Sequence, residues 1–405
     1  ACRGEARQSE DGSVANTSLR GLHVSAVKKT SFPMSSIEYQ ILLAASDIEP
    51  CMEQQQKLLG LISQEFDQGR LVEMAVREGV AGLLYKNLKK LGVLGYLGHR
   101  QIEKLQSFYY SAARLNLKLL HDLKEILQII DQSKIRVVLL QGIPLLQQIY
   151  KDVGLRPLTD IDLWVLPEYF PGVERTLVKL GYRNAPFYPK TFKRNSTLID
   201  VNTHILWTDR IKSRRFLINE GQQDIYENCR AIDIEGETAD CLSRTDQVIY
   251  LSLHAFKHNL DRLIWLADIN NLLKGWEASD WAALDERSRE LGIKHVVNYI
   301  LFYLDHLFEF KFSPDARAIY EYTKIGYLER HILRKRLLGK PLTVWGPLLL
   351  LPLGKSLYRR VSFILENLFP GPRVLRQIFA KPPDFSLWQL YLKRARQLLT
   401  HTRNN

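Results

Sequence analysis

The chain has 405 residues, of which 46% are hydrophobic and 25% are charged, and its formal net charge is +12. These proportions are typical of folded globular proteins and exclude a collagen-like, coiled-coil or wholly disordered chain. At about 100–200 residues per domain, the length predicts two or three domains. The 4 cysteines form no C-x-x-C pair, which argues against a disulfide scaffold or a cysteine-based zinc site and predicts a reducing, cytoplasmic compartment.

The positive charge is concentrated near the C-terminus. From residue 330 onward there are 15 Lys and Arg and only two acids, a net charge of +13, so the rest of the chain carries −1. We expect residues 330–405 to form a basic arm that contacts acidic lipid, nucleic acid or an acidic protein. The apolar run 342–353 within it is shorter than the roughly 20 residues that span a bilayer, so we expect no transmembrane span. This run either lies in an anionic interface at the inner face of the membrane or packs on the body of the protein.

Residues 1–33 lack an apolar core and periodicity, which predicts a disordered leader, unless the native chain starts at Met34. In residues 34–132 apolar side chains recur at spacings of three and four, which predicts four or five helices.

Residues 133–242 change to short β-rich runs, and residues 243–329 return to a helical pattern that opens with Ser243 and Asp246, a variant capping box. The predicted strands are 136–140, 161–166 and 198–206, followed by a hairpin over 231–242. The sequence therefore predicts an α+β fold, with a small mixed sheet set between two helical blocks.

The sharpest local feature is Thr159-Asp160-Ile161-Asp162. Side chains alternate along a strand, so Asp160 and Asp162 share one face, about 7 Å apart. Two carboxylates on one face repel unless a cation lies between them, and oxygen ligands favour Mg²⁺ or Mn²⁺. A D-x-D pair alone is more often a solvated surface pair, so its surroundings decide the interpretation.

Upstream of this pair, Gln141-Gly142 ends a predicted strand and Pro144 follows in the first turn of a helix. This order favours a backbone turn whose amides face an anion. Arg156 lies four residues before Asp160 and is placed to give a bidentate contact to phosphate.

The third predicted strand carries Asp200, Asn202 and His204 on one face by the same alternation. Asp160, Asp162 and Asp200 then form a cradle on adjacent strands. Such a cradle can hold two metal ions about 3.5–4 Å apart, which activate an attacking hydroxyl and neutralise a leaving pyrophosphate. We interpret His204 as a packing or supporting residue rather than a base.

The helix after Ser243 holds His254 and His258, four residues apart, with Lys257 and Arg262 close by. Zinc is disfavoured because the Glu of H-E-x-x-H and a third ligand are absent. Either Lys257 or Arg262 binds nucleotide phosphates, or His254 and His258 belong to a structural polar network. Trp265 and Leu266 are expected in the core.

The run LLQGIPLLQQIYKDVGLRPLTDIDLWV resembles the glycine turn and D-x-D core of the polymerase-beta-like nucleotidyltransferase superfamily, in particular its group of uncharacterised nucleotidyltransferases. The similarity extends over most of the chain after Met34. It implies magnesium-dependent transfer of a nucleoside monophosphate from a nucleoside triphosphate, with two ions. In that mechanism Asp160 and Asp162 bind both ions, Asp200 binds the catalytic ion and helps to deprotonate the acceptor, and Gly142 lets the triphosphate approach the backbone.

The chain departs from that group at three positions. It has Gln141 where the group usually has Lys, Ile143 where the wider superfamily often has Ser or Gly, and Asn202 where the group tends to have an acid two residues before the strand histidine. These departures leave open a catalytically impaired nucleotide-binding or membrane-docking scaffold. The acceptor is also open: a sugar phosphate, a protein hydroxyl, an RNA end or an antibiotic-like small molecule.

Overall fold

The computed structural model describes residues 35–403 except 186–187, 207–210, 218–221, 321–324, 343–345, 352–355 and 380–383. The expectations for residues 1–33 therefore lie outside the described part. The described residues all belong to one compact unit, residues 35–405.

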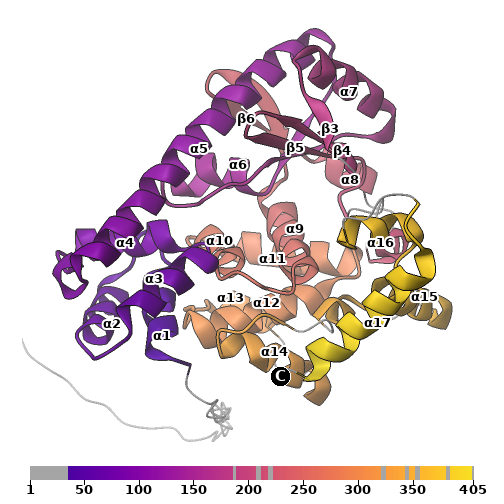
Figure 1. The fold of residues 1–405 in the computed structure, drawn as a ribbon. Helices are drawn as coiled ribbons and strands as arrows, with labels where there is room; N and C mark the ends of the chain where they lie inside the picture. The colour runs from indigo at the N-terminus through magenta and orange to yellow at the C-terminus, as the bar shows by residue number, and fades with distance from the viewer. Residues whose placement is uncertain are drawn as a thin grey trace, which may run out of the picture. The chain divides into compact units, whose positions relative to one another are not determined.

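Five α-helices precede the first strand, which confirms the prediction for this block. Their bounds are α1 Ile37–Ala44, α2 Met52–Ile62, α3 Gln68–Arg77, α4 Ala81–Lys90 and α5 His99–Gln132. In Figure 1, α5 runs as one long helix alongside the sheet. It buries the apolar stripe of Leu119, Leu123 and Ile126, spaced by three and four residues.

The sheet has seven described strands in the order β3-β4-β5-β2-β1-β7-β6. Their bounds are β1 Val138–Leu140, β2 Ile161–Trp164, β3 Arg183–Ala185, β4 Tyr188–Arg194, β5 Thr197–Asn202, β6 Arg230–Ile234 and β7 Glu237–Cys241. The sheet is mixed, because β2 is parallel to β5 and β1 to β7 while the other pairs are antiparallel. The three predicted strands and the hairpin are thus confirmed. The hairpin turns at Glu235 and Gly236, whose φ angles of 53° and 90° fit a primed turn.

The sequence did not predict two of the strands, β3 and β4. β3 and β4 form an antiparallel pair at one end of the sheet, and β4 contains Lys190, Lys193 and Arg194, which we had interpreted only as a basic stretch. A strand with so many charged residues lacks the apolar alternation on which strand prediction depends.

The two faces of the sheet have different partners. Thr197, which begins β5, donates a hydrogen bond to Asp122 of α5, and Ile199 and Val201 on the same face are buried. Residues 198, 200 and 202 point to the opposite face by alternation. The face that carries Asp200 is therefore the one turned away from α5.

The helices that follow the sheet start with α9, capped by Ser243, whose hydroxyl accepts a hydrogen bond from the Asp246 amide at 3.1 Å. This start confirms the predicted cap. The remaining helices are α6 Gly142–Leu145, α7 Phe170–Lys179, α8 Gln222–Glu227, α9 Arg244–Lys257, α10 Ile264–Leu272, α11 Ala278–Glu290, α12 Lys294–Leu307, α13 Pro314–Ile319, α14 Tyr327–Leu337, α15 Leu357–Leu368, α16 Pro372–Phe379 and α17 Leu387–Arg403. A π-helical segment, Leu146–Tyr150, continues α6.

Residues 330–405, which we expected to form a basic arm, pack on the rest of the unit. The fully buried Arg336 forms an ion pair with Glu78, with 2.6 Å between Nη2 and Oε2. Glu366 of α15 accepts hydrogen bonds from the backbone amides of Lys212 and Ser213 at 2.8 and 2.6 Å. One positive charge of this segment, that of Arg336, is therefore neutralised inside the protein.

The apolar run 342–353 is described only in part, because 343–345 and 352–353 lie outside the described residues. Leu342, Leu349 and Leu350 are buried, and the 3₁₀ helix Gly346–Leu350 contacts α9. Among the residues that the structure describes, no helix combines the length and apolar character needed to cross a bilayer.

His295 of α12 gives the fold a pH dependence that can be measured. Burial lowers its pKa to about 4, whereas an unfolded chain has a histidine pKa of about 6.5. The unfolded state therefore binds the proton first, and stability is lost as the pH falls from about 6.5 toward 4. We expect His295→Gln to reduce the loss of unfolding free energy between pH 7 and pH 4.5 by about 2 kcal/mol in urea titrations.

The matched control is His121→Gln, because His121 is exposed on α5. An unchanged pH profile in the His295 variant would contradict the assignment.

Candidate active site

Asp160, Asp162 and Asp200 come together where β2 and β5 lie side by side. The parallel register places Asp162 directly opposite Asp200, and Asp160 stands two residues before Asp162, just ahead of β2. The structure thus brings all three predicted carboxylates to one face of the sheet. Asn202 pairs instead with the buried Trp164, one pleat further along β5.

Burial and mutual repulsion disfavour the charged forms of the first two carboxylates. The pKa of Asp162 lies well above its ordinary value because the group is buried, with Asp160 and Asp200 adding repulsion. The pKa of Asp160 is raised by burial and by Asp200, and is opposed by Thr159, Arg156 and Lys257. Uptake of a proton or of a metal cation would relieve this repulsion.

Hydrogen bonds from threonine side chains orient two of the three carboxylates. Thr191 of β4 donates to Asp200, and Thr159 donates to Asp160 at 3.0 Å. Asp162 is 7% exposed and receives no hydrogen bond from a described residue.

The oxygen-only donor set fits magnesium or manganese. Within the described ranges, no group of three or more His, Cys, Asp and Glu side chains is arranged so that it could hold a metal ion by itself. Mg²⁺ usually binds one or two carboxylates together with water and substrate phosphates, so a protein site need not be complete. The residues present therefore fit a metal whose remaining ligands come from a nucleotide.

The strand-to-helix turn at Gln141 and Gly142 is strained. Gln141 has φ 55° and ψ −117°, which a residue with a side chain adopts only at an energetic cost. A Cβ on Gly142 would clash with the side chain of Leu158 and lie 2.5 Å from Nη1 of Arg156. A side chain at position 142 would therefore displace the ends of the Leu158 and Arg156 side chains.

Arg156 occupies a different position from the one we expected. It is 4% exposed, and its Nε and Nη2 bind both carboxylate oxygens of Asp268 on α10 at 2.8–3.0 Å. The bidentate partner is thus a protein carboxylate rather than a phosphate. Nη1 lies beside Gly142 and makes no hydrogen bond to a described residue, so this nitrogen alone faces the site.

Asn116 of α5 holds the loop that leads to Asp160. Its amide donates to the carbonyls of Val153 and Arg156 at 2.7 and 2.8 Å, and its oxygen accepts from the Leu158 amide at 3.1 Å. We did not single out Asn116 from the sequence; its only signal there is a polar residue within an apolar helix stripe.

Two cavities meet at the carboxylates. The turn cavity, about 30 Å³, is lined by Gln141, Gly142, Arg156, Asp160, Asp162, Arg262 and Trp265 among others. The strand cavity, about 590 Å³, is lined by Asp160, Tyr188, Lys190, Thr191, Asp200, Asn202, Lys257, Arg373 and Gln377 among others. Asp160 borders both, so the two cavities share one carboxylate.

The two cations that were predicted to bind phosphates line different cavities. Lys257, at the end of α9, lines the strand cavity, and Arg262 lines the turn cavity. Arg262 also lines an outer cavity of about 620 Å³, together with Arg77 and Phe108.

The histidines of α9 form an aromatic cluster. The ring centroids of His254 and His258 lie 4.6 Å apart, and His258 stacks on Trp265 at 5.9 Å. Burial lowers the pKa of His254 well below its ordinary value, so this ring is neutral. His204 follows β5, and its Nδ1 accepts a hydrogen bond from the Leu206 amide at 3.0 Å. All three histidines thus have structural contacts.

Several residues of the site were missed or misjudged from the sequence. Trp265 was expected in the core but is half-buried, lines the turn cavity and donates from Nε1 to Asp261 at 3.0 Å. Thr191 and Lys190 lie on the unpredicted strand β4. Arg373 belongs to α16 and comes 183 residues after Lys190 in the chain.

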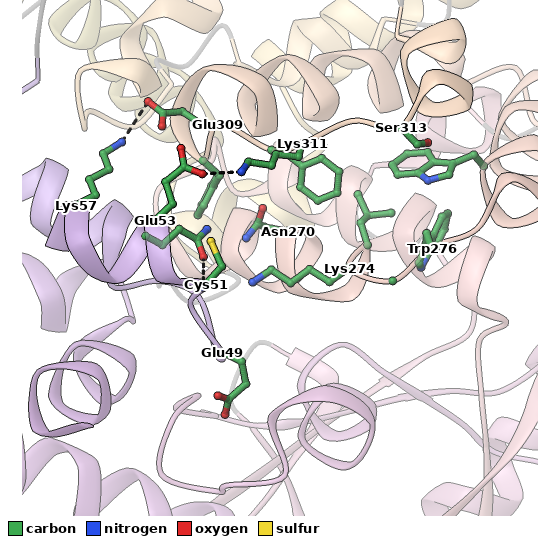
Figure 2. Close-up of a pocket in the computed structure, with 16 residues that line it drawn as sticks. Glu49, Cys51, Glu53, Lys57, Asn270, Lys274, Trp276, Glu309, Lys311 and Ser313 are labelled. Carbon is green, nitrogen blue, oxygen red and sulfur yellow. Dashed lines mark hydrogen bonds and ion pairs between the residues drawn. The ribbon is translucent and has the colours of Figure 1, made fainter. Parts of the chain in front are cut away.

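A separate cavity of about 540 Å³ lies between the first helical block and the helices after the sheet. In Figure 2, Lys57 points to Glu309 and Lys311 to Glu53, and these pairs measure 3.2 and 2.5 Å. Lys274 is paired with Asp47 at 2.9 Å. These charged side chains thus form ion pairs within the protein.

Comparison with known proteins gives one match. The family model described as "Uncharacterised nucleotidyltransferase" matches residues 64–309, more than half of the chain. No curated protein and no solved structure matches significantly. The matched span contains the turn at Gly142, the three carboxylates and both predicted cations. The chain therefore belongs to the uncharacterised nucleotidyltransferase family, and nucleotidyl transfer is the general role that the family indicates.

Proposed function

We propose that the protein is a nucleotidyltransferase that uses two Mg²⁺ or Mn²⁺ ions to move a nucleoside monophosphate from a nucleoside triphosphate to an acceptor. The observation that carries this proposal is the β2–β5 register, which sets Asp162 opposite Asp200 with Asp160 two residues away. The strained turn at Gln141-Gly142 beside them supports it, because such strain is concentrated at functional sites.

The residues divide the work as follows. Asp160 and Asp162 would hold both ions and Asp200 one of them, and the bound ions would neutralise charge on the triphosphate and on the leaving pyrophosphate. Asp200, oriented by Thr191, accepts the proton of the acceptor hydroxyl at a carboxylate oxygen. The acceptor oxygen then forms a bond to the α-phosphorus while the bond to the β-phosphate oxygen breaks, and pyrophosphate leaves with that electron pair.

Asp160→Asn combined with Asp162→Asn tests this assignment. We expect magnesium-dependent binding of nucleoside triphosphates to weaken at least about tenfold, because two charged hydrogen-bonding and metal-binding groups are lost. Equilibrium dialysis of the four triphosphates, with Mg²⁺ or with EDTA, measures the effect. Circular dichroism verifies the fold.

Asp131→Asn on the exposed surface of α5 is the control. Undiminished magnesium-dependent binding in the double variant would rule out the proposed metal site. A protein that binds nucleotide normally but transfers no label to any acceptor would instead be the nucleotide-binding scaffold considered above.

Contact of residues 330–405 with an acidic lipid, nucleic acid or protein, with peripheral binding at the inner membrane face, also belongs to this proposal. Exposed cations of the segment support it; these include Arg334, Lys340, Arg359 and Lys393.

A further inference from the structure

We infer that the strand cavity is the acceptor site and that it takes a small acceptor carrying a phosphate group. This inference rests on the proposed function, because it assigns the second substrate of the same site. Three observations support it. The carboxylates are distributed over two cavities, cations line the strand cavity, and α16 forms one of its walls.

The carboxylates stand between two cavities. Of these two cavities, the turn cavity is lined by Asp162, the strand cavity by Asp200, and both by Asp160. In phosphoryl transfer the attacking and leaving oxygens lie roughly in line on opposite sides of the phosphorus. A triphosphate on one side of Asp160 therefore requires the acceptor on the other.

The turn cavity is where the phosphates of the triphosphate bind. It contains the Gln141-Gly142 turn and Arg262, and it shares Arg262 and Pro157 with the outer cavity. The turn cavity is too small for a nucleotide, but the outer cavity of about 620 Å³ offers room for the remainder. The strand cavity is then left for the acceptor, next to Asp200, the carboxylate that takes its proton.

Three cations from three elements line the strand cavity: Lys190 of β4, Lys257 of α9 and Arg373 of α16. Lys190 is held by a hydrogen bond to Thr203 at 2.6 Å. Arg373 is exposed and forms no ion pair with a described acid. With Asp160 and Asp200 engaged by metal, this arrangement suits a dianion, and a guanidinium binds phosphate in a bidentate manner.

The size and walls of the cavity indicate a small molecule. Its volume of about 590 Å³ falls within the range of about 300–1,000 Å³ typical of small-ligand sites. Tyr188 donates a hydrogen bond from its hydroxyl to the Gln377 carbonyl at 3.2 Å, which joins β4 to α16 across the cavity. Tyr188, Leu198 and Val374 give an apolar surface for the rest of the acceptor. The C-terminal segment therefore supplies one wall of the site.

The first test measures binding of inorganic phosphate to the full chain by ³¹P line broadening, with Mg²⁺ and saturating α,β-methylene ATP to occupy the nucleotide side. Nucleotide binding is measured beforehand. We expect Arg373→Ala to weaken phosphate binding about tenfold, because a hydrogen-bonded charge is removed. Arg373→Lys should restore part of the affinity. Lys104→Ala, which removes an exposed cation of α5 that does not line the cavity, should change the affinity less than about twofold.

The second test follows label from α-³²P triphosphates into a cell extract separated by mass. The inference predicts label in the low-mass fraction, and loss of that label when the fraction is first treated with immobilised phosphatase. Label in RNA or protein, or in a phosphatase-insensitive small molecule, would overturn it, as would absence of phosphate binding in the nucleotide complex. Absence of nucleotide binding itself would instead refute the proposed function.

Discussion

Asp200→Asn is expected to slow label transfer from α-³²P triphosphates about a thousandfold while triphosphate affinity changes less than about threefold. Asn has nearly the same size and still accepts the hydrogen bond from Thr191, but it cannot take up a proton or hold a cation as a carboxylate does. The loss should therefore fall on the chemical step. Single-turnover rates at saturating nucleotide measure it directly.

Thr191→Val serves as a second variant, because it removes only the hydrogen bond that orients Asp200. We expect a loss of about tenfold, consistent with a role in positioning. Asn202→Ala should slow transfer much less than Asp200→Asn, since Asn202 pairs with Trp164 rather than with Asp162. Full activity of the Asp200 variant, or equal losses at positions 200 and 202, would contradict the assignment of the third carboxylate.

Arg336→Met is expected to lower the free energy of unfolding by about 3 kcal/mol, the lower end of the range for breaking a buried ion pair. Glu78 is 1% exposed and would keep only the Leu263 amide at 2.8 Å and the solvent-exposed Arg77 at 3.4 Å. The buried carboxylate would thus lose its closest cation. Urea denaturation followed by circular dichroism measures the change.

The double variant Glu78→Gln with Arg336→Met separates the pair from simple loss of packing. Because it leaves no uncompensated charge, we expect it to recover at least about 1 kcal/mol relative to Arg336→Met. Lys340→Met, an exposed cation of the same segment, is the control and should change stability by less than about 0.5 kcal/mol. Equal stability of the single and double variants would show that the ion pair contributes nothing specific.

The sequence predicted those parts of the fold that depend on local pattern. Apolar spacing gave the five helices before the sheet, and β-branched runs gave β1, β2, β5 and the hairpin. The alternation rule also placed Asp160 and Asp162 on one face. β4 was missed because its charged side chains interrupt the apolar alternation; this strand is stabilised by pairing with β3 and β5 on its two sides.

The other features of the site depend on contacts between distant segments. The register of β5 against β2 decides whether Asp200 or Asn202 lies opposite Asp162, and no local pattern specifies this register. Asp268, which takes the guanidinium of Arg156, lies 112 residues away, and Arg373 reaches the strand cavity from α16. Only the tertiary structure brings these residues together.

The contacts of Glu78 also affect how the chain can fold during its synthesis. Its carboxylate is completed by Leu263 and Arg336, which are 185 and 258 residues further along the chain. During synthesis on the ribosome, α3 is thus finished long before its partners leave the exit tunnel. Until then the Glu78 carboxylate has only the exposed Arg77 of its own block beside it, so it must remain hydrated. Final packing of this block is therefore expected only after translation has passed α14, which makes nascent chains of intermediate length natural clients for chaperones.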